Sequence, residues 1–330
     1  MRRTPTMIVT LSDNANCKNV QTTLQGLGLW TRPLRGQVDS AITLLVERHS
    51  THVPIERIVR VAGVREVFTA ESPHPLVDKQ ANRPVAVGRW AIGTEQPLLM
   101  AGPCSIESES QALAAAAIAA GCGAALLRGG AFKPRSSPYA FSGHGRPALR
   151  WMRKAADRHG LGVVTEVMSE HEVLHVAAHA DVLQIGSRNM QNFALLEAVG
   201  RARRPVLLKR GMAATVEDWL MSGEHLLAAG AAGVVFCERG IQSFDDNTRN
   251  LLDLGAVALL RHVLKQPVIV DPSHAVGRRD LIVPLCRAAV AAGAHGLLVE
   301  VHPNANDARS DGPQALDESA LAIIGKQLRS

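Results

Sequence analysis

The chain has 330 residues, a formal net charge of +6 and only 3% aromatic residues. This length is enough for one large domain with its own core and a small second domain. The sequence shows no long basic run and few aromatic residues that could stack on bases, which argues against a nucleic-acid-binding protein. Because no apolar stretch reaches 18 residues, we also expect no membrane-spanning helix.

The cysteine content indicates the compartment. The five cysteines are odd in number and lack CxxC spacing, as is typical of a reducing compartment. They are Cys17, Cys104, Cys122, Cys237 and Cys286. The first residues, Met1–Met7, carry positive charge, but no apolar segment of signal-peptide quality follows them. We therefore expect a soluble cytoplasmic protein.

Residues 7 to 75 show strand-like and helix-like patterns in alternation. We expect extended segments at Met7–Leu11, Thr31–Leu34, Ser40–Glu47 and Val64–Thr69, and helices at Asn16–Leu27 and Pro54–Ala62. This βαββαβ order is that of a ferredoxin-like domain. No catalytic group of residues is found in it, so we expect regulation, assembly or plain oligomerisation as its role.

Prolines mark the next segment as a connection between domains. Pro73, Pro75 and Pro84 predict a linker over Ser72–Val87, and Val87–Gly93 is a candidate strand that caps the bottom of the next domain. We therefore divide the chain into a ferredoxin-like domain (residues 1–75), a linker and cap (76–94) and a larger domain (95–330).

The larger domain repeats one pattern, a short apolar run that ends in polar or glycine residues. The eight runs are Leu98–Ser105, Ala125–Gly130, Val163–Val167, Val182–Ser187, Val206–Gly211, Val234–Gly240, Val268–His274 and Leu297–Pro303. Helix-compatible segments separate them, including Glu107–Ala120, Ala148–His159, Glu170–Ala178, Thr215–Ala229, Asn247–Val263 and Asp280–Ala292. Eight β/α units predict a (β/α)8 TIM barrel of the α/β class, with its active site at the carboxyl ends of the strands. A doubly wound sheet is the structural alternative.

Four residues that follow strands predict a metal site. Cys104 follows the first strand, His274 the seventh and Glu300 the eighth, and Asp311 lies in the loop after the eighth. These three strands are neighbours in a closed barrel, and such a mixed sulfur, nitrogen and oxygen set suits Mn²⁺, Fe²⁺, Co²⁺ or Zn²⁺. His302, which points the same way as Glu300 along a strand, is the alternative ligand. Cys237 is a candidate for an oxidation-sensitive pair with Cys104.

Basic residues also gather at the strand ends. They are Arg128, Lys133, Arg135, Arg188, Lys209, Arg210 and Arg239. Cations collected in one barrel mouth repel one another unless anions neutralise them, so we infer two sites for phosphate-type groups. The alternative for the first three is an ordinary solvated basic loop.

The motifs at the strand ends carry a family resemblance. They are GPCS, LRGGAFKPRSSPYAF, GVVTEV, LQIGSRNMQNF, PVLLKRGM, CERGI, DPSHAVGRRDL, VEVHP and the later SDG. Together they closely resemble 3-deoxy-D-arabino-heptulosonate 7-phosphate (DAHP) synthases of type I, β subgroup, over about residues 95–315. The N-terminal segment is similar, in length and pattern only, to the ferredoxin-like domain that some members use for feedback control by tyrosine or phenylalanine.

The resemblance implies a reaction and a set of roles. The reaction is condensation of phosphoenolpyruvate with erythrose 4-phosphate, the first step of the shikimate pathway to aromatic amino acids. Cys104, His274, Glu300 and Asp311 match the metal ligands, with Mn²⁺ as the first choice. Arg128, Lys133, Arg188, Lys209 and Arg239 match the phosphoenolpyruvate site. Arg135 and Ser136 match the site of the aldose phosphate, and Asp271 lies near the sugar hydroxyls. A homo-oligomer, a tetramer by resemblance, is also implied.

The chemistry adds candidate catalytic residues. Carbon 3 of phosphoenolpyruvate attacks an aldehyde that a metal polarises, and water then captures carbon 2 before phosphate leaves. We expect Lys209 and Glu166, at neighbouring strand ends, to move protons to and from that water, beside the metal-site residues Cys104 and His274. A plain ion pair with one of the cations is the alternative role for Glu166.

Two other functions remain open. A sister synthase joins phosphoenolpyruvate to arabinose 5-phosphate, but it carries a KANRSS-like run where this chain has KPRSSP at residues 133–138. A catalytically silent barrel that regulates a partner is the second alternative. All four metal positions and all the cations are present, so the sequence offers no reason for loss of activity.

Overall fold

The chain forms two compact units, Met1–Pro75 and Leu76–Ser330. The computed structural model describes residues 7–34, 42–47, 53–69, 72–133, 139 and 141–329. Arg135 and Ser136, two predicted substrate-binding residues, lie outside the described residues.

The first unit is the predicted ferredoxin-like domain. Its elements are β1 (Met7–Leu11), α1 (Cys17–Gly26), β2 (Thr31–Leu34), β3 (Thr43–Val46), α2 (Ile55–Val59) and β4 (Val64–Thr69). The antiparallel sheet has the order β2-β3-β1-β4, which confirms the predicted fold. Alternate residues of β1, Met7, Val9 and Leu11, pack against Val20 and Leu24 of α1, so the domain has its own core.

Residues 76–94 are ordered and belong to the second unit. α3 (Pro75–Gln80) is followed by a hairpin of β5 (Val85–Val87) and β6 (Trp90–Ile92). Both amide atoms of the Gln80 side chain hydrogen-bond to the backbone of Val234, at 2.8 and 2.9 Å. The apolar side chains of the hairpin pack against the side chains inside the barrel, so this segment caps one end of the barrel.

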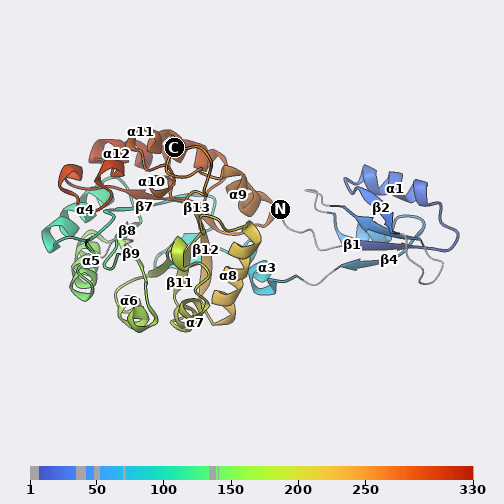
Figure 1. The fold of residues 1–330 in the computed structure, drawn as a ribbon, viewed down its shortest axis with the longest axis horizontal. Helices are drawn as coiled ribbons and strands as arrows, with labels where there is room; N and C mark the ends of the chain where they lie inside the picture. The colour runs from blue at the N-terminus through green and yellow to red at the C-terminus, as the bar shows by residue number, and fades with distance from the viewer. Residues whose placement is uncertain are drawn as a thin grey trace. The chain divides into compact units, whose positions relative to one another are not determined.

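The second unit is a closed barrel of eight parallel strands (Figure 1). They are β7 (Leu98–Gly102), β8 (Leu126–Arg128), β9 (Gly162–Glu166), β10 (Val182–Ile185), β11 (Pro205–Lys209), β12 (Gly233–Glu238), β13 (Val268–Val270) and β14 (Gly296–Glu300). Pairing of β14 with β7 closes the barrel, through the register from Gly296↔Leu98 to Glu300↔Gly102. The strands are buried on both faces because helices cover the outside, which explains their continuous apolar runs.

The helices that cover the barrel follow the strands. They are α4 (Glu109–Gly121), α5 (Arg146–His159), α6 (Val173–Ala177), α7 (Phe193–Arg201), α8 (Val216–Ala228), α9 (Leu254–Ala258), α11 (Arg279–Ala291) and α12 (Glu318–Gln327). A short additional helix, α10 (Pro272–Val276), carries His274 and lies between β13 and α11. No helix of the described chain is both long enough and apolar enough to cross a membrane.

The helix predicted over Asn247–Val263 is wrong in its first half. Helical structure begins only at Leu254, because the Asp253 side chain accepts a hydrogen bond from the backbone N–H of Ala256 and caps α9 there. The preceding segment is an irregular loop whose backbone hydrogen-bonds to residues 275 and 276 and to Ile241. This difference matters because the segment reaches the active-site cavity.

His295 is buried at the end of the barrel where the strands begin. The ring Nδ1 accepts a hydrogen bond from the backbone N–H of Val268 at 3.1 Å, and Nε2 lies 2.6 Å from Nη1 of Arg261. Burial, together with the neighbouring Arg261 guanidinium, lowers the pKa of His295 from 6.5 to about 4.

This lowered pKa predicts acid destabilisation. Between pH 6.5 and about 4 the unfolded chain binds a proton at this residue and the folded chain does not. The free energy of unfolding should therefore decrease as the pH falls through that window and stop responding to His295 below it. Urea unfolding at pH 7 and pH 5 checks this, with His295→Gln as the variant that keeps an acceptor for Val268. An equal decrease in both proteins would contradict the assignment.

Candidate active site

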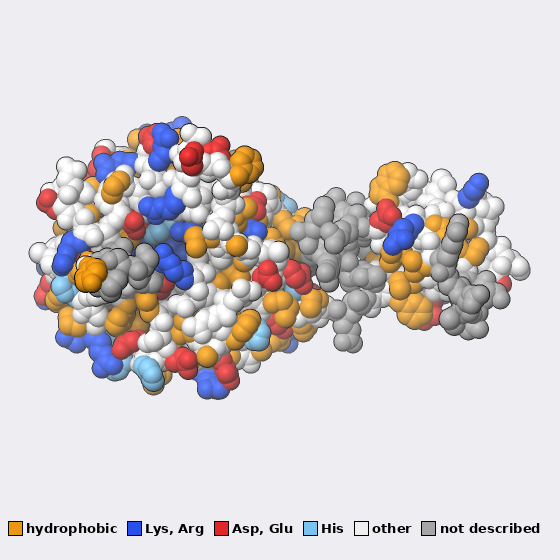
Figure 2. Space-filling model, viewed as in Figure 1, with side chains coloured by type: hydrophobic (Ala, Val, Ile, Leu, Met, Phe, Trp, Pro, Cys, Tyr) orange, Lys and Arg blue, Asp and Glu red, His pale blue; other side chains and the backbone are white. Residues whose placement is uncertain are grey.

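A cavity of about 330 Å³ opens at the carboxyl ends of the strands. Figure 2 shows Lys and Arg side chains gathered on this face of the barrel. Among the described residues, the cavity is lined by Cys104, Arg128, Gly129, Gly130, Lys133, Glu166, Gln184, Gly186, Ser187, Arg188, Lys209, Met212, Arg239, Arg249, Asn250, His274 and Asp311. The volume suits small anionic molecules, and its walls are strongly cationic.

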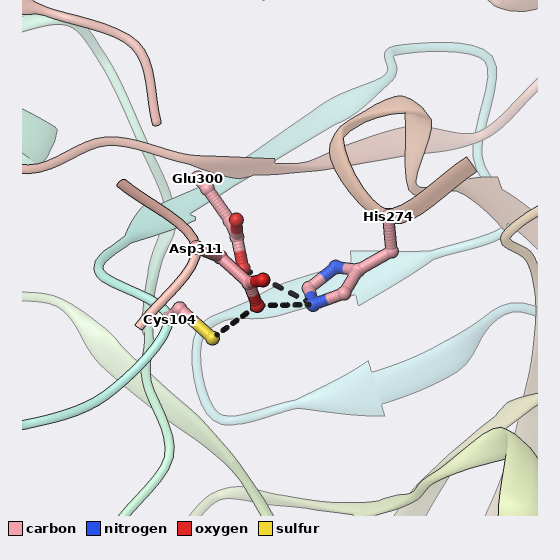
Figure 3. Close-up of side chains that lie close together, drawn as sticks. All are labelled: Cys104, His274, Glu300 and Asp311. Atoms are coloured by element: carbon pink, nitrogen blue, oxygen red, sulfur yellow. Dashed lines mark hydrogen bonds and ion pairs between the residues drawn. The ribbon is translucent and has the colours of Figure 1, made fainter. Parts of the chain in front are cut away.

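The four predicted metal ligands lie together at one side of this cavity (Figure 3). One ligand atom from each of Cys104, His274, Glu300 and Asp311 lies within 4.8 Å of the others. Cys104 Sγ is 3.0 Å from Asp311 Oδ2, and His274 Nε2 is 3.1 Å from Glu300 Oε1 and 4.0 Å from Asp311 Oδ2. One thiol, one imidazole nitrogen and two carboxylates form a donor set that fits a divalent transition metal ion.

Neighbouring side chains orient the candidate ligands. Nδ1 of His274 is 2.8 Å from Oδ2 of Asp271, so the other ring nitrogen, Nε2, faces the remaining ligands. The Gln314 side chain donates a hydrogen bond to Oε2 of Glu300, which leaves Oε1 directed at His274. Support of this kind, around each ligand, is typical of protein metal sites.

The electrostatics of the site also fit a cation. Burial, followed by the negative charge of Glu300, raises the pKa of the Cys104 thiol to about 12. Although burial opposes it, the neighbouring His274 imidazole and Lys209 ammonium hold the pKa of Asp271 well below its usual value. A bound divalent cation would offset the repulsion between the ligands and favour the thiolate of Cys104.

The predicted phosphoenolpyruvate-binding cations that the structure describes all line the cavity. Lys133 Nζ is 2.9 Å from Cys104 Sγ, so this lysine connects the cationic wall with the ligand group. Arg128 is buried and donates to Glu300 Oε1 at 3.1 Å and to the Pro103 carbonyl at 3.0 Å. These two residues are thus held in place before any substrate enters.

Asp271, predicted to lie near the sugar hydroxyls, is not among the described residues that line the cavity. It is fully buried beneath the cavity, and its oxygens are occupied by the backbone N–H and Nδ1 of His274 and by Nζ of Lys209, at 2.5 Å. Its carboxylate therefore supports Lys209 and His274.

Glu166 lines the same cavity as Lys209, but their strands are not neighbours, because β10 lies between β9 and β11. The sequence-based statement of neighbouring strand ends is therefore wrong. Gly186 makes room for the Glu166 carboxylate, since a Cβ at that position would lie 2.0 Å from Oε1. Gln184 Nε2 lies 3.4 Å from Oε2 and orients the group.

Three other candidates lie outside the ligand group and the cavity lining. Arg210 points away from the cavity and pairs with Glu238 at 3.0 Å and Asp253 at 2.8 Å, because successive strand side chains face opposite sides. His302 is not part of the four-residue group. Cys237 is a buried free thiol on β12, and β13 and β14 separate that strand from β7, which precedes Cys104.

Two cavity residues, Arg249 and Asn250, were missed by the sequence interpretation. Arg249 Nη2 lies 3.6 Å from Asp311 Oδ1. The Asn250 amide oxygen accepts a hydrogen bond from Arg239 Nη1 at 3.2 Å, and its nitrogen donates to the Arg249 carbonyl at 3.3 Å. The predicted helix over residues 247–263 concealed them, because a helix there would have placed them on the outside of the barrel. The consecutive polar residues before Leu251 were the available signal of a loop.

Comparisons with known proteins agree on one family. Residues 75–330 match the family described as DAHP synthetase I. The chain is 40% identical over 298 residues to the phospho-2-dehydro-3-deoxyheptonate aldolase of Thermotoga maritima, covering 89% of this chain and 88% of the relative.

Two solved structures of DAHP synthase are also similar to this chain. The crystal structure of the Thermotoga maritima phospho-2-dehydro-3-deoxyheptonate aldolase (DAHP synthase) superposes with a TM-score of 0.77 and 37% identity, covering 98% of this chain and 96% of that one. A truncated form of the Thermotoga maritima synthase gives a TM-score of 0.70 and 42% identity over 76% of this chain and 91% of that one.

A second set of relatives matches less of the chain. The 2-dehydro-3-deoxyphosphooctonate aldolase of Acidithiobacillus ferrooxidans is 38% identical over 246 residues, covering 68% of this chain and 86% of the relative.

Proposed function

The chain belongs to the DAHP synthetase I family, and from this premise we propose the following reaction for its barrel cavity. Phosphoenolpyruvate condenses with D-erythrose 4-phosphate and water to give 3-deoxy-D-arabino-heptulosonate 7-phosphate and inorganic phosphate. The observation that carries the proposal is a four-residue metal-ligand group directly beside a cation-lined cavity. The enzyme is thus a transferase of aromatic amino acid biosynthesis.

The cations of the cavity bind the two anionic reactants. Arg128, Lys133, Arg188, Lys209 and Arg239 hold phosphoenolpyruvate, and Arg135 and Ser136 hold the aldose phosphate. Arg128 and Lys133 are already fixed by hydrogen bonds, so little ordering is needed when substrate enters. Their positive charge offsets the repulsion between the reactants, which brings carbon 3 of the enol close to the aldehyde.

Cys104, His274, Glu300 and Asp311 hold one divalent ion, Mn²⁺ by first choice, with Fe²⁺, Co²⁺ or Zn²⁺ as alternatives. The ion, when bound, supplies Lewis acidity toward the aldehyde carbonyl of the sugar phosphate. Asp271 and Gln314 keep the acceptor atoms of His274 and Glu300 directed at it.

Lys209 and Glu166 transfer the protons when water adds to carbon 2. Both line the cavity, and Lys209 Nζ is held at 2.5 Å from the buried Asp271 carboxylate. Glu166 has no ion-pair partner among the described residues, which favours proton transfer over the alternative role of an ion-pair partner.

The reaction is tested by following the ultraviolet absorbance of phosphoenolpyruvate in metal-free protein. We expect absorbance to fall only after Mn²⁺ is added and only with erythrose 4-phosphate. Consumption with arabinose 5-phosphate would instead assign the chain to the activity named for its 2-dehydro-3-deoxyphosphooctonate aldolase relatives. No consumption with either sugar would indicate a catalytically silent barrel.

The N-terminal domain binds an aromatic amino acid that regulates the activity of the barrel. The chain works in the cytoplasm. It assembles as a homo-oligomer, a tetramer. Support comes from the two compact units, each with its own core, and from five cysteines that are all free. Sedimentation of the full-length chain tests the tetramer.

Removal of residues 1–75 tests the regulation. We expect tyrosine or phenylalanine to inhibit the full-length enzyme and to leave a chain of residues 76–330 active and uninhibited, because the barrel unit contains the whole cavity. Initial rates with and without each amino acid provide the measurement. Inhibition that survives the truncation would place the effector site in the barrel.

A further inference from the structure

Two serines, Ser105 and Ser310, lie immediately beside two of the candidate metal ligands. Ser105 follows Cys104 in the loop after β7, and Ser310 precedes Asp311 in the loop after β14. Both side chains are buried, and their hydroxyl oxygens are 2.6 Å apart. This contact joins two loops that are 205 residues apart in sequence at the point where each presents a ligand.

Glu107 extends this contact. Its Oε1 accepts a hydrogen bond from the Ser105 hydroxyl at 3.3 Å and from the backbone N–H of Arg309 at 2.8 Å. Since the Ser105 proton is directed to the carboxylate, Ser310 donates to Ser105, and the three groups form a chain from Ser310 through Ser105 to Glu107. We call Ser105, Ser310 and Glu107 the serine clasp.

The clasp acts on the loop that carries Asp311. It leaves the barrel after Val301 and returns at Leu316, where a backbone bridge joins the two residues. At Asp311 itself the backbone is left-handed, with φ of +53°, a conformation that residues other than glycine rarely adopt. Aspartate adopts this conformation more often than most other non-glycine residues. The clasp constrains the two positions directly before Asp311, Arg309 and Ser310.

The clasp is also connected to the rest of the metal-site wall. The loop that carries Ser105 is joined to the segment just after β8. The Gly130 N–H donates to the Cys104 carbonyl and the Ile106 N–H donates to the Gly130 carbonyl, both at 3.0 Å. The loop of Cys104 is thus a rigid support. Through the clasp, the loop of Asp311 is held on it.

We propose that the serine clasp is a positioning device for the metal site. It holds the Asp311 carboxylate at 3.0 Å from the Cys104 thiol and so prepares two of the four ligands for a divalent cation. Ser105, Ser310 and Glu107 do not ligate the ion themselves and act through Cys104 and Asp311. This inference depends on the proposed metal site. It adds the residues that strengthen the binding of the metal ion there.

Cobalt titration of the full-length, metal-free protein tests the clasp, because Co²⁺ bound to a thiolate has a charge-transfer absorption that reports on Cys104 directly. We expect Ser310→Ala and Ser105→Ala each to weaken Co²⁺ binding about 10- to 100-fold, as is usual when groups that orient metal ligands are removed. The double variant should be no weaker than the worse single variant, because both changes remove the same contact.

Two further variants separate positioning from general stability. Ser222 is another buried serine of the barrel unit, whose hydroxyl donates within α8 to the Asp218 carbonyl at 2.8 Å. Ser222→Ala should leave the Co²⁺ affinity unchanged, and its melting temperature measures the effect on stability of losing a buried serine hydroxyl away from the metal site. Ser310→Thr keeps a hydroxyl and should recover much of the affinity that Ser310→Ala loses.

The outcomes are distinguishable. Unchanged Co²⁺ affinity in Ser310→Ala and Ser105→Ala, even with a lower melting temperature, would overturn the clasp and leave the metal site intact. Absence of the thiolate band in the unmodified protein would overturn the metal site and the clasp together.

Discussion

Replacing Cys104 with alanine is expected to reduce kcat by at least about 10³-fold, because the loss of the bound ion removes several kcal/mol of transition-state stabilisation. The thiol is buried, directed at Asp311 and the sole sulfur in the ligand group, so no neighbour replaces it. Initial rates of phosphoenolpyruvate loss with added Mn²⁺, together with the metal content of the purified protein, provide the measurement.

Cys122→Ala is the matched control for this variant. Cys122 is also a buried thiol, but it ends α4 and contacts the Glu318 carbonyl, away from the cavity. It should retain activity and metal, with a stability loss of about 1 kcal/mol for the small space left behind. If Cys104→Ala bound Mn²⁺ and turned over as well as Cys122→Ala does, the proposed metal site would be wrong.

Lys209→Met should have the second largest effect, a fall in kcat of about 10²- to 10⁴-fold, which is the usual range for a lost proton-transfer group. It should also lower the free energy of unfolding by about 1.5–3 kcal/mol, because the fully buried Asp271 loses a charged hydrogen-bond partner. Steady-state kinetics and urea unfolding measure the two effects separately.

The companion variant is Lys209→Met with Asp271→Asn. Neutralising Asp271 removes the uncompensated buried charge, so stability should recover in part while kcat remains low. Recovery of both would show that Lys209 serves only to balance the charge of Asp271, and would contradict its role in proton transfer.

Much of the architecture could be predicted from local sequence patterns. Short apolar runs such as β1 and β12 predicted the strands of both sheets correctly, because buried strands are rich in β-branched and other apolar residues. The polar residues at or just after the carboxyl ends of β7, β13 and β14 identified the candidate ligands. All parallel strands of a barrel end on the same face, so residues just after them must lie near one another.

The direction in which each side chain points, and the geometry of the loops, became clear only from the tertiary structure. Lys209 and Arg210 are adjacent in sequence, yet one faces the cavity and the other pairs with Glu238 outside it, since the strand alternates its side chains. Because Asp253 caps α9, this helix begins at Leu254, later than predicted. Arg249 therefore lies in a loop and lines the cavity.

The sequence by itself therefore determined the two folds, the family and the residues that follow each strand. Only the tertiary structure decided that Asp271 supports Lys209 and His274 from below, and that Ser105 meets Ser310 across two distant loops. The physical reason is that strand patterns depend on burial along the chain. Contacts between loops depend on how the closed barrel brings together segments that are hundreds of residues apart.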